Sequence, residues 1–520
     1  MKMAVLFGIF APILFSLVLT LIPKERKELF FPLAIFGSTI PVATALYLYI
    51  NQQPEPPIDA VRNREQFETI AWIKPYGIDW VLSVNGVSIM MILLTAILVP
   101  LAILSSSSTL RETKGFLISI LVIESAVVGV FTSGDLLSFF LFFEAILIPM
   151  YFLIGIWGGE NRKYATIKFI LYTVFGSIFL FAGTVMVGLL VGQQFGRLGF
   201  DFNTVQMLVL SVQQEKILFL LFTFAFAVKI PIFPFHTWLP DAHVEAPTAG
   251  SILLAGVLLK LGTYGIITIS IPFFTEGYIA YRNYLAVLGV IGIIYGAIVA
   301  IPQKDIKKLV AYSSVSHMGF IVLGIASGTG SAMKGALLHM VNHGITTGAL
   351  FMLVGFLYDR RHTRDMSELG GVKTVMPLYA ATFLITSLAS IGLPGLNGFV
   401  GEFLILVSSY DPYSLVFTLA PIFAATGVVL AAIYMLGAYE RIFTGPIMNE
   451  KNESLNDLSL REKLAIGPLV TLMFLFGVYP YVLERAINEW LYRYHYGLGL
   501  ENIIFSSYFE SMSVYIQGLF

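Results

Sequence analysis

The sequence predicts an all-α membrane protein with about fourteen transmembrane helices. Hydrophobic residues make up 57% of the 520 residues and charged residues only 12%, which is far from the composition of a soluble domain. The hydrophobic residues also form long runs, and about 20 residues in a helix are enough to cross a hydrocarbon core roughly 30 Å thick. The candidate spans lie near residues 4–22, 30–50, 82–105, 115–133, 136–157, 166–192, 216–236, 248–271, 283–301, 308–326, 331–357, 376–410, 414–437 and 464–480.

The first three spans form an N-terminal part, residues 1–109. Further spans follow residues 4–22 and no small-residue cleavage site is evident, so we expect this run to be a retained helix and not a signal peptide. The segment 51–80 is polar and rich in proline, which predicts a surface loop on the outer side.

Two five-helix repeats of inverted topology are expected next, in residues 110–272 and 273–440. Each contains one helix broken by proline or glycine. The first break holds Pro231 and Pro234, and the second holds Pro394 and Gly395. A pair of interrupted segments in corresponding positions is typical of inverted repeats with a site near the middle of the membrane.

The last part, residues 441–520, is expected to contain a polar inner loop at 445–463, the final span and an interfacial tail from Tyr481. The odd-numbered loops hold most of the lysine and arginine residues, including the run RRHTR at 360–364. By the positive-inside rule, this bias predicts that both termini lie on the outer side of the membrane.

Several classes of function are excluded or disfavoured. The chain has no cysteine, so it carries no disulfide, thiolate zinc site or cysteine-ligated iron–sulfur cluster. It lacks the glycine-rich GxGxxG strand–helix unit of dinucleotide-binding folds. The net charge of −1 gives no sign of a nucleic-acid partner, and the lipid bilayer is the partner that the composition indicates.

Ionisable residues inside the predicted spans are the candidate functional groups. Each costs roughly 2.5–3.5 kcal/mol to insert, so such residues usually face the interior of the bundle and carry function. Their spread along the chain suggests a row of protonatable groups across the membrane. They are Glu124, Glu144, Lys229, Lys260, His317, His339, His343 and Glu402.

Lys229 stands directly before the first break, where Pro231 opens the helix and water can reach the backbone. A carboxylate such as Glu144 would hold the lysine proton, and moving that carboxylate away would release it. The alternative is a fixed ion pair that ties two helices together. For Glu124, a hydrogen bond to a neighbouring helix is the corresponding alternative.

The remaining histidines have simpler interpretations. His339 and His343 have the i, i+4 spacing of a zinc pair, but no third ligand follows nearby, so a relay or polar packing is expected and no metal is predicted. His236 and His243 flank Trp238 just after the first break and are expected to structure a loop, with His236 also a candidate relay residue.

Five stretches resemble the antiporter-like membrane subunits of respiratory complex I, which belong to the Mrp antiporter superfamily. They are FFLFFEAILIPMYFLIGIWGG (139–159), PFHTWLPDAHVEAPTAGSILLAGVLLKLGTYG (234–265), IPQKDIKKLVAYSSVSHMG (301–319), LLHMVNHGITTGALFMLVG (337–355) and GLPGLNGFVGEFLIL (392–406). Within this superfamily the chain resembles the M-type (chain 4) branch. That branch carries glutamate at the position of Glu402, where the L-type, N-type and large Mrp-type subunits carry lysine.

The resemblance implies a role for each member of the row. Glu144 would pair with Lys229 as the coupling ion pair of the inner half-channel. Lys260 and His317 would link the centre of the membrane, His343 would continue the path, and Glu402 would be the exit group toward the outer face. Glu124, His236 and His339 are additional relay candidates.

The implied function is proton translocation by a non-redox subunit of an NADH:quinone oxidoreductase in the bacterial inner membrane. The family carries no cofactor on this subunit. NADH, FMN, iron–sulfur clusters and quinone belong to partner subunits, and the membrane neighbours are of the L and N type. Two alternatives remain open at this stage, a subunit of an Mrp-type Na⁺/H⁺ antiporter and a structural spacer whose channel is inactive.

Overall fold

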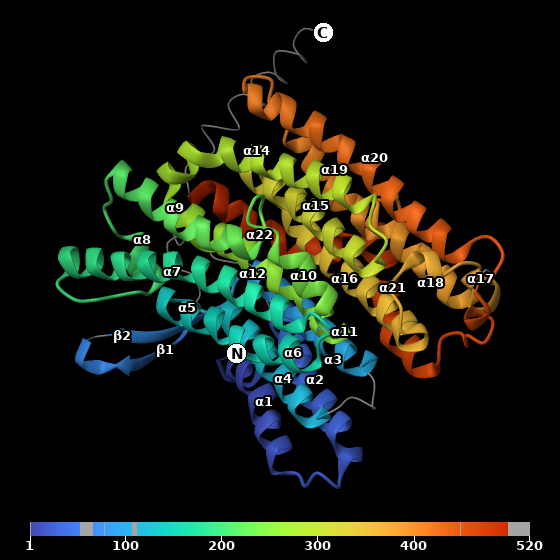
Figure 1. Cartoon of the computed structure of the whole chain (residues 1–520). Coiled ribbons are helices and arrows are strands. Elements are labelled where there is room, and N and C mark those ends of the chain that lie inside the picture. The colour runs from blue at the N-terminus through green and yellow to red at the C-terminus, as the bar shows by residue number, and fades with distance from the viewer. Residues whose placement is uncertain (1, 52–65, 77, 107–111, 448, 498–520) are drawn as a thin grey trace.

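The computed structural model describes residues 2–51, 66–76, 78–106, 112–447 and 449–497. Helices pack side by side in one bundle, and a small β-hairpin projects from its edge (Figure 1). Within the described residues, 11 helices are long and apolar enough to cross a membrane. The chain is therefore a multi-pass membrane protein, as the sequence predicts.

These 11 helices include one that is interrupted by two π-helical segments, η4 and η5, and one that is divided in two at Ile146. Their elements are α1 (Lys2–Leu21), α2 (Phe30–Ile50), α3 (Gly86–Ser105), α4 (Thr113–Thr132), α5 (Leu136–Ala145) with α6 (Leu147–Trp157), α7 (Arg162–Phe195), α11 (Thr248–Leu253) with η4 (Leu254–Leu258), α12 (Leu259–Gly265), η5 (Ile266–Ser270) and α13 (Ile271–Phe273), α14 (Thr275–Ala300), α15 (Ile306–Ser327), α16 (Gly330–Arg361) and α20 (Leu415–Phe443).

Three further segments coincide with the other expected spans. They are α9 (Val212–Lys229) with α10 (Trp238–Glu245), α18 (Pro377–Ser390) with α19 (Asn397–Ser408), and α21 (Leu460–Val478), which is bent by 70° against α22 (Tyr481–Gly497). The first two are the helices that the sequence predicts to be broken. The shorter connecting elements are η1 (Lys27–Leu29), η3 (Lys74–Tyr76), α8 (Phe202–Gln206), η6 (Met366–Glu368), α17 (Val372–Val375) and η7 (Glu450–Asn452).

Polar caps define where several helices begin. The side chains of Asn85, Asp135 and Thr329 accept backbone N–H bonds at the first turns of α3, α5 and α16. Ser211 and Ser459 form capping boxes at the starts of α9 and α21. Each cap satisfies a backbone donor that has no partner inside the helix.

The segment 51–80 differs from the expected loop. Residues 52–65 lie outside the described residues, but β1 (Gln66–Ile73) and β2 (Ile78–Ser83) pair antiparallel in the register Thr69–Val81 and Ile70–Trp80. The β-branched and aromatic residues of TIAWI (69–73) and the apolar run in β2 favour strand pairing, but the prolines before them obscure this signal.

The tail after Tyr481 begins as a helix that packs on the bundle. Leu483, Ala486 and Ile487 of α22 are buried, and Glu484 forms an ion pair with Lys334 at 2.8 Å. The rest of the expected interfacial tail, residues 498–520, lies outside the described residues.

Candidate functional site

The first helix break lies directly after Lys229, the last residue of α9, and the chain resumes as helix α10. The indole N–H of Trp238 donates to the carbonyl of Val228 at 2.9 Å, across the break. The protein thus satisfies a carbonyl that the interrupted helix leaves open, which is a condition for irregular backbone at membrane depth.

Lys229 is buried with a 3% exposed fraction, and its ammonium faces aromatic rings. Its Nζ lies 4.8 Å from the ring centroid of Phe143 and 5.9 Å from that of Phe169. It has no hydrogen-bond partner among the described residues. A cation that contacts aromatic faces and has no hydrogen-bond acceptor is weakly tethered, since each cation–π contact stabilises by about 0.5–2 kcal/mol.

Glu144 does not form the expected contact ion pair with Lys229. The Ser177 hydroxyl of α7 donates to the Glu144 carboxylate instead, although the carboxylate and the ammonium still interact electrostatically. The structure therefore records the pair in a separated arrangement. The serine, which sequence analysis did not single out, competes with the lysine for the carboxylate.

Lys260 occupies a short α-helical piece, α12, between the π-helical segments η4 and η5. Its side chain is completely buried. A π turn shifts the backbone hydrogen bonds from i+4 to i+5, and such turns occur frequently at functional sites. The Lys260 ammonium donates to the carbonyl of Ala255, a residue of η4. The local irregularity therefore supplies an acceptor for a buried cation.

A continuous set of contacts runs from Lys260 to Glu402. Lys260 Nζ lies 2.7 Å from His343 Nδ1, and the rings of His343 and His317 are 5.5 Å apart between centroids. His317 Nδ1 then lies 3.0 Å from Glu402 Oε1. We call Lys260, His343, His317 and Glu402 the central row. Its four members come from α12, α16, α15 and α19 and are all buried.

His339 joins the same cluster one helical turn from His343. Its Nε2 lies 3.5 Å from Glu402 Oε1, and its ring centroid is 5.5 Å from that of His317. Both ring nitrogens of His339 lack a hydrogen-bond partner among the described residues. The i, i+4 spacing in α16 thus places both of its histidines near His317.

The second break positions Glu402. Gly392 has a φ of +73°, and a Cβ there would lie 2.8 Å from Glu402 Oε2. Gly401 faces α16 so closely that a Cβ would lie 2.7 Å from the His339 Cβ and 2.9 Å from its backbone N. Glycine at these two positions permits the turn and the close approach that bring the carboxylate to the histidines.

Helix α19 is also fixed by an asparagine pair. Asn342 Nδ2 donates to the Asn397 carbonyl at 2.6 Å, and Asn397 Nδ2 donates to the Asn342 carbonyl at 3.3 Å. Thr346 donates to Asn397 Oδ1 at 3.2 Å. These bonds satisfy the broken end of α18–α19 and hold it in register with α16.

Two expected relay residues, Glu124 and His236, lie apart from the central row, as does the loop histidine His243. Glu124 is fully buried in α4, and neither carboxylate oxygen has a hydrogen-bond partner among the described residues. His236 stacks on Phe233 with ring centroids 5.6 Å apart, and His243 stacks on Phe351 at 4.5 Å. These histidines pack on aromatic rings, and His243 interacts electrostatically with both Lys260 and Lys307.

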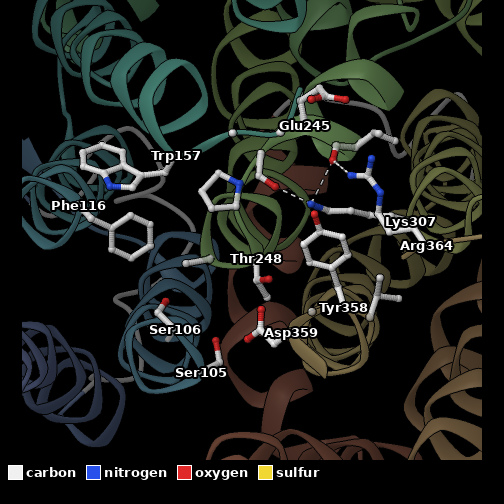
Figure 2. Close-up of a pocket in the computed structure, with 18 residues that line it drawn as sticks. Ser105, Ser106, Phe116, Trp157, Glu245, Thr248, Lys307, Tyr358, Asp359 and Arg364 are labelled. Carbon is white, nitrogen blue, oxygen red and sulfur yellow. Dashed lines mark hydrogen bonds between the residues drawn. The ribbon is translucent and has the colours of Figure 1, made fainter. Parts of the chain in front are cut away.

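A cavity of about 200 Å³, lined by both polar and apolar side chains, opens where α10 ends and α11 and α15 begin (Figure 2). On one side Lys307 donates to the carbonyl of Ala246 at 2.5 Å, and Arg364 donates to that of Val244. Both cations thus bind carbonyls at the C-terminal end of α10, Val244 in its last turn and Ala246 at its C-cap, where positive charge is favoured. The sequence predicted only a topological role for Arg364. The cavity has room for several water molecules.

Comparison with known proteins is consistent across sequence and structure. The family model of the NADH:quinone oxidoreductase/Mrp antiporter transmembrane region matches residues 133–428. An NADH-quinone oxidoreductase subunit M from Rickettsia felis is 40% identical over 91% of this chain and 94% of its own length. The Rhodobacter capsulatus subunit M is 42% identical over 83% and 85%. A chain of respiratory complex I from Thermus thermophilus superposes with a TM-score of 0.83 at 31% identity, covering 95% of this chain and 99% of that one.

Proposed function

The chain belongs to the NADH:quinone oxidoreductase/Mrp antiporter family, and we propose that it translocates protons as the M-type membrane subunit of a complex I. The observation that carries the proposal is the central row, because protonatable side chains follow one another from Lys260 to Glu402 inside a hydrophobic bundle. Burying four such groups has a high energetic cost, and a spacer would have no need of them.

Each contact in the row suits proton transfer. At 2.7 Å, Lys260 Nζ and His343 Nδ1 share a hydrogen bond, so one of these two nitrogens holds the proton and the other offers a lone pair. His317 faces Glu402 in the same way. The gap between the rings of His343 and His317 is the one step that needs ring rotation or a bridging water.

We infer that proton uptake from the inner side uses the cavity beside Lys307 and Arg364. It offers room for water beside Lys307, and His243 lies within electrostatic range of both Lys307 and Lys260. The separated Glu144–Lys229 pair would act as the coupling switch. When it closes, the carboxylate stabilises the ammonium, and when it opens, the lysine proton is released toward the row.

The proposal includes the setting of the chain. Residues 110–272 and 273–440 would form two inverted repeats in a bacterial inner membrane, with both termini outside. NADH oxidation, FMN, iron–sulfur clusters and quinone would reside on partner subunits, and L-type and N-type subunits would be the membrane neighbours. The Mrp-type antiporter is the weaker alternative, because the relatives reported above are quinone oxidoreductase subunits.

The test uses Glu402→Gln, which keeps the shape and a hydrogen bond to His317 but cannot carry a proton. Inverted membrane vesicles are energised with NADH, and proton uptake and quinone reduction are recorded together. We expect both to fall at least tenfold in an assembled complex, as loss of a proton-transferring group usually costs about 10²–10⁴ in rate. Glu440→Gln, at an exposed position of α20, is the matched control. Wild-type proton uptake in Glu402→Gln would contradict the proposal.

A further inference from the structure

We propose that His317, His339 and Glu402 form a binding site for a divalent transition-metal ion such as Zn²⁺. Each residue offers one ligand atom, and these three atoms all lie within 4.8 Å of one another. They come from α15, α16 and α19, so the site exists only in the folded bundle. The sequence pointed to His339 with His343, whereas the structure groups His339 with a histidine and a carboxylate from other helices.

Two of the three distances between the ligand atoms are close to those of a zinc site. With bonds of about 2.0–2.1 Å and tetrahedral angles, two zinc ligands lie about 3.4 Å apart. Glu402 Oε1 is 3.0 Å from His317 Nδ1 and 3.5 Å from His339 Nε2. An ion would require shifts of a few tenths of an ångström on these two edges. The His317 and His339 ligand atoms, which lie within 4.8 Å of each other, would also have to approach to about 3.4 Å, and water would take the fourth position.

The surroundings of the ligands also fit a metal. His317 Nε2 lies 3.3 Å from the Ser390 hydroxyl, so its other nitrogen, Nδ1, is directed at Glu402. An outer hydrogen bond of this kind orients most metal-binding histidines. His339 is 2% exposed and neither ring nitrogen has a hydrogen-bond partner among the described residues. A metal bond to Nε2 would satisfy a buried polar atom that otherwise lacks one.

The scaffold holds this geometry firmly. The reciprocal bonds between Asn342 and Asn397 and the close approach at Gly401 fix α19 against α16. Two imidazoles and one carboxylate favour Zn²⁺ and similar transition metals over Mg²⁺ and Ca²⁺, which prefer oxygen ligands. Since the ion would occupy the lone pairs that join His317 to Glu402, it would block the central row. This last consequence rests on the proposed function, whereas binding does not.

The experiment measures metal content, independently of activity. Purified complex containing the full chain is treated with a chelator, equilibrated with micromolar Zn²⁺, freed of excess and analysed for zinc by mass spectrometry. The variants are His339→Gln, Glu402→Gln and Ser390→Ala, with His362→Gln as a control at an exposed histidine. Zinc-edge X-ray absorption of the wild type reports the ligands.

We expect the wild type and His362→Gln to retain about one zinc more per complex than His339→Gln and Glu402→Gln, bound through two imidazoles and oxygen. Ser390→Ala should bind zinc about 10–100-fold more weakly, since it loses only the hydrogen bond that orients His317. This variant tests the site if the other two variants fail to assemble. Equal zinc content and affinity in all assembled proteins would overturn the site. If His339→Gln and Glu402→Gln lose zinc as expected while Glu402→Gln translocates protons at the wild-type rate, the metal site is supported and the proposed function is refuted.

Discussion

Replacing Lys260 by methionine separates the proton-carrying role of the central row from its contribution to packing. Methionine has nearly the same length and no charge. In the structure Lys260 is fully buried, its ammonium donates to the Ala255 carbonyl, and it lies 2.7 Å from His343 Nδ1. The substitution removes these polar contacts and leaves the apolar stem in place.

The expected effect on stability is small, because two terms oppose each other. Removing a lysine from the bundle relieves an insertion cost of roughly 2.5–3.5 kcal/mol. Leaving His343 Nδ1 and the Ala255 carbonyl without the ammonium costs about 1–3 kcal/mol. The net change is within about 2.5 kcal/mol of zero, so the complex should assemble. The kinetic effect is large. Loss of a proton-transferring group that lowers the rate by a factor of about 10² corresponds to an increase of about 2.7 kcal/mol in the activation barrier.

The assay records NADH-driven proton uptake and quinone reduction in inverted vesicles, with the thermal midpoint of the purified complex as the measure of folding. We expect both rates to fall at least tenfold with a midpoint near that of the wild type. Lys163→Met, at an exposed position near the start of α7, is the matched control and should keep wild-type rates. An assembled Lys260→Met complex that pumps as fast as this control would refute the relay.

Three further predictions concern other contacts within the bundle. Ser177→Ala frees the Glu144 carboxylate from its hydrogen bond, so we expect tighter pairing with Lys229 and slower proton release. The measurement is a lower turnover at unchanged assembly. An unchanged turnover would argue that the serine has no part in the switch. Gly401→Ala places a methyl group 2.7 Å from the His339 Cβ, which should destabilise the α16–α19 contact by about 1–3 kcal/mol and lower the thermal midpoint of the complex. The control Gly437→Ala, at a position where nothing lies within 4 Å, should leave the midpoint unchanged. Arg360→Met removes a bidentate ion pair with Glu462, whose two N–O distances are 2.5 and 2.7 Å. A double-mutant cycle with Glu462→Gln should give a coupling free energy of about 1–3 kcal/mol in stability. A coupling near zero would show that water replaces the ion pair.

Sequence patterns predicted much of the architecture, because hydrophobic run length and helix-breaking residues are local signals. Both broken helices occur where Pro231 and Pro394 indicated them, and the family comparisons confirm the assignment that the motifs suggested. The two-stranded hairpin at β1–β2 was not anticipated, since proline and charge dominate the composition of the segment that precedes it.

The arrangement of the site was harder to predict. The buried position of Glu402 followed from its hydrophobic surroundings, but its contact with His317 joins residues 85 positions apart. Ser177, Ser390 and Asn397 carry no intramembrane charge, so nothing in the sequence distinguished them from other small polar residues. The separation of Glu144 from Lys229 depends on which hydrogen bond the carboxylate makes, and only side-chain coordinates show that.

The π-helical segments beside Lys260 have a consequence for insertions and deletions. Because η4 spreads its turn over more residues than an α-helix does, it holds one residue in excess of the α-helical pattern. Deleting one residue from Leu254–Leu258 would let the segment close as ordinary α-helix. The residues after it would then keep about the same direction relative to α11, because the wide π turn had absorbed the extra residue. Lys260 would still face His343, whereas removing one residue from an ordinary α-helical stretch would turn it by about 100°. The segment η4 is thus a place where the helix can lose a residue without turning the lysine.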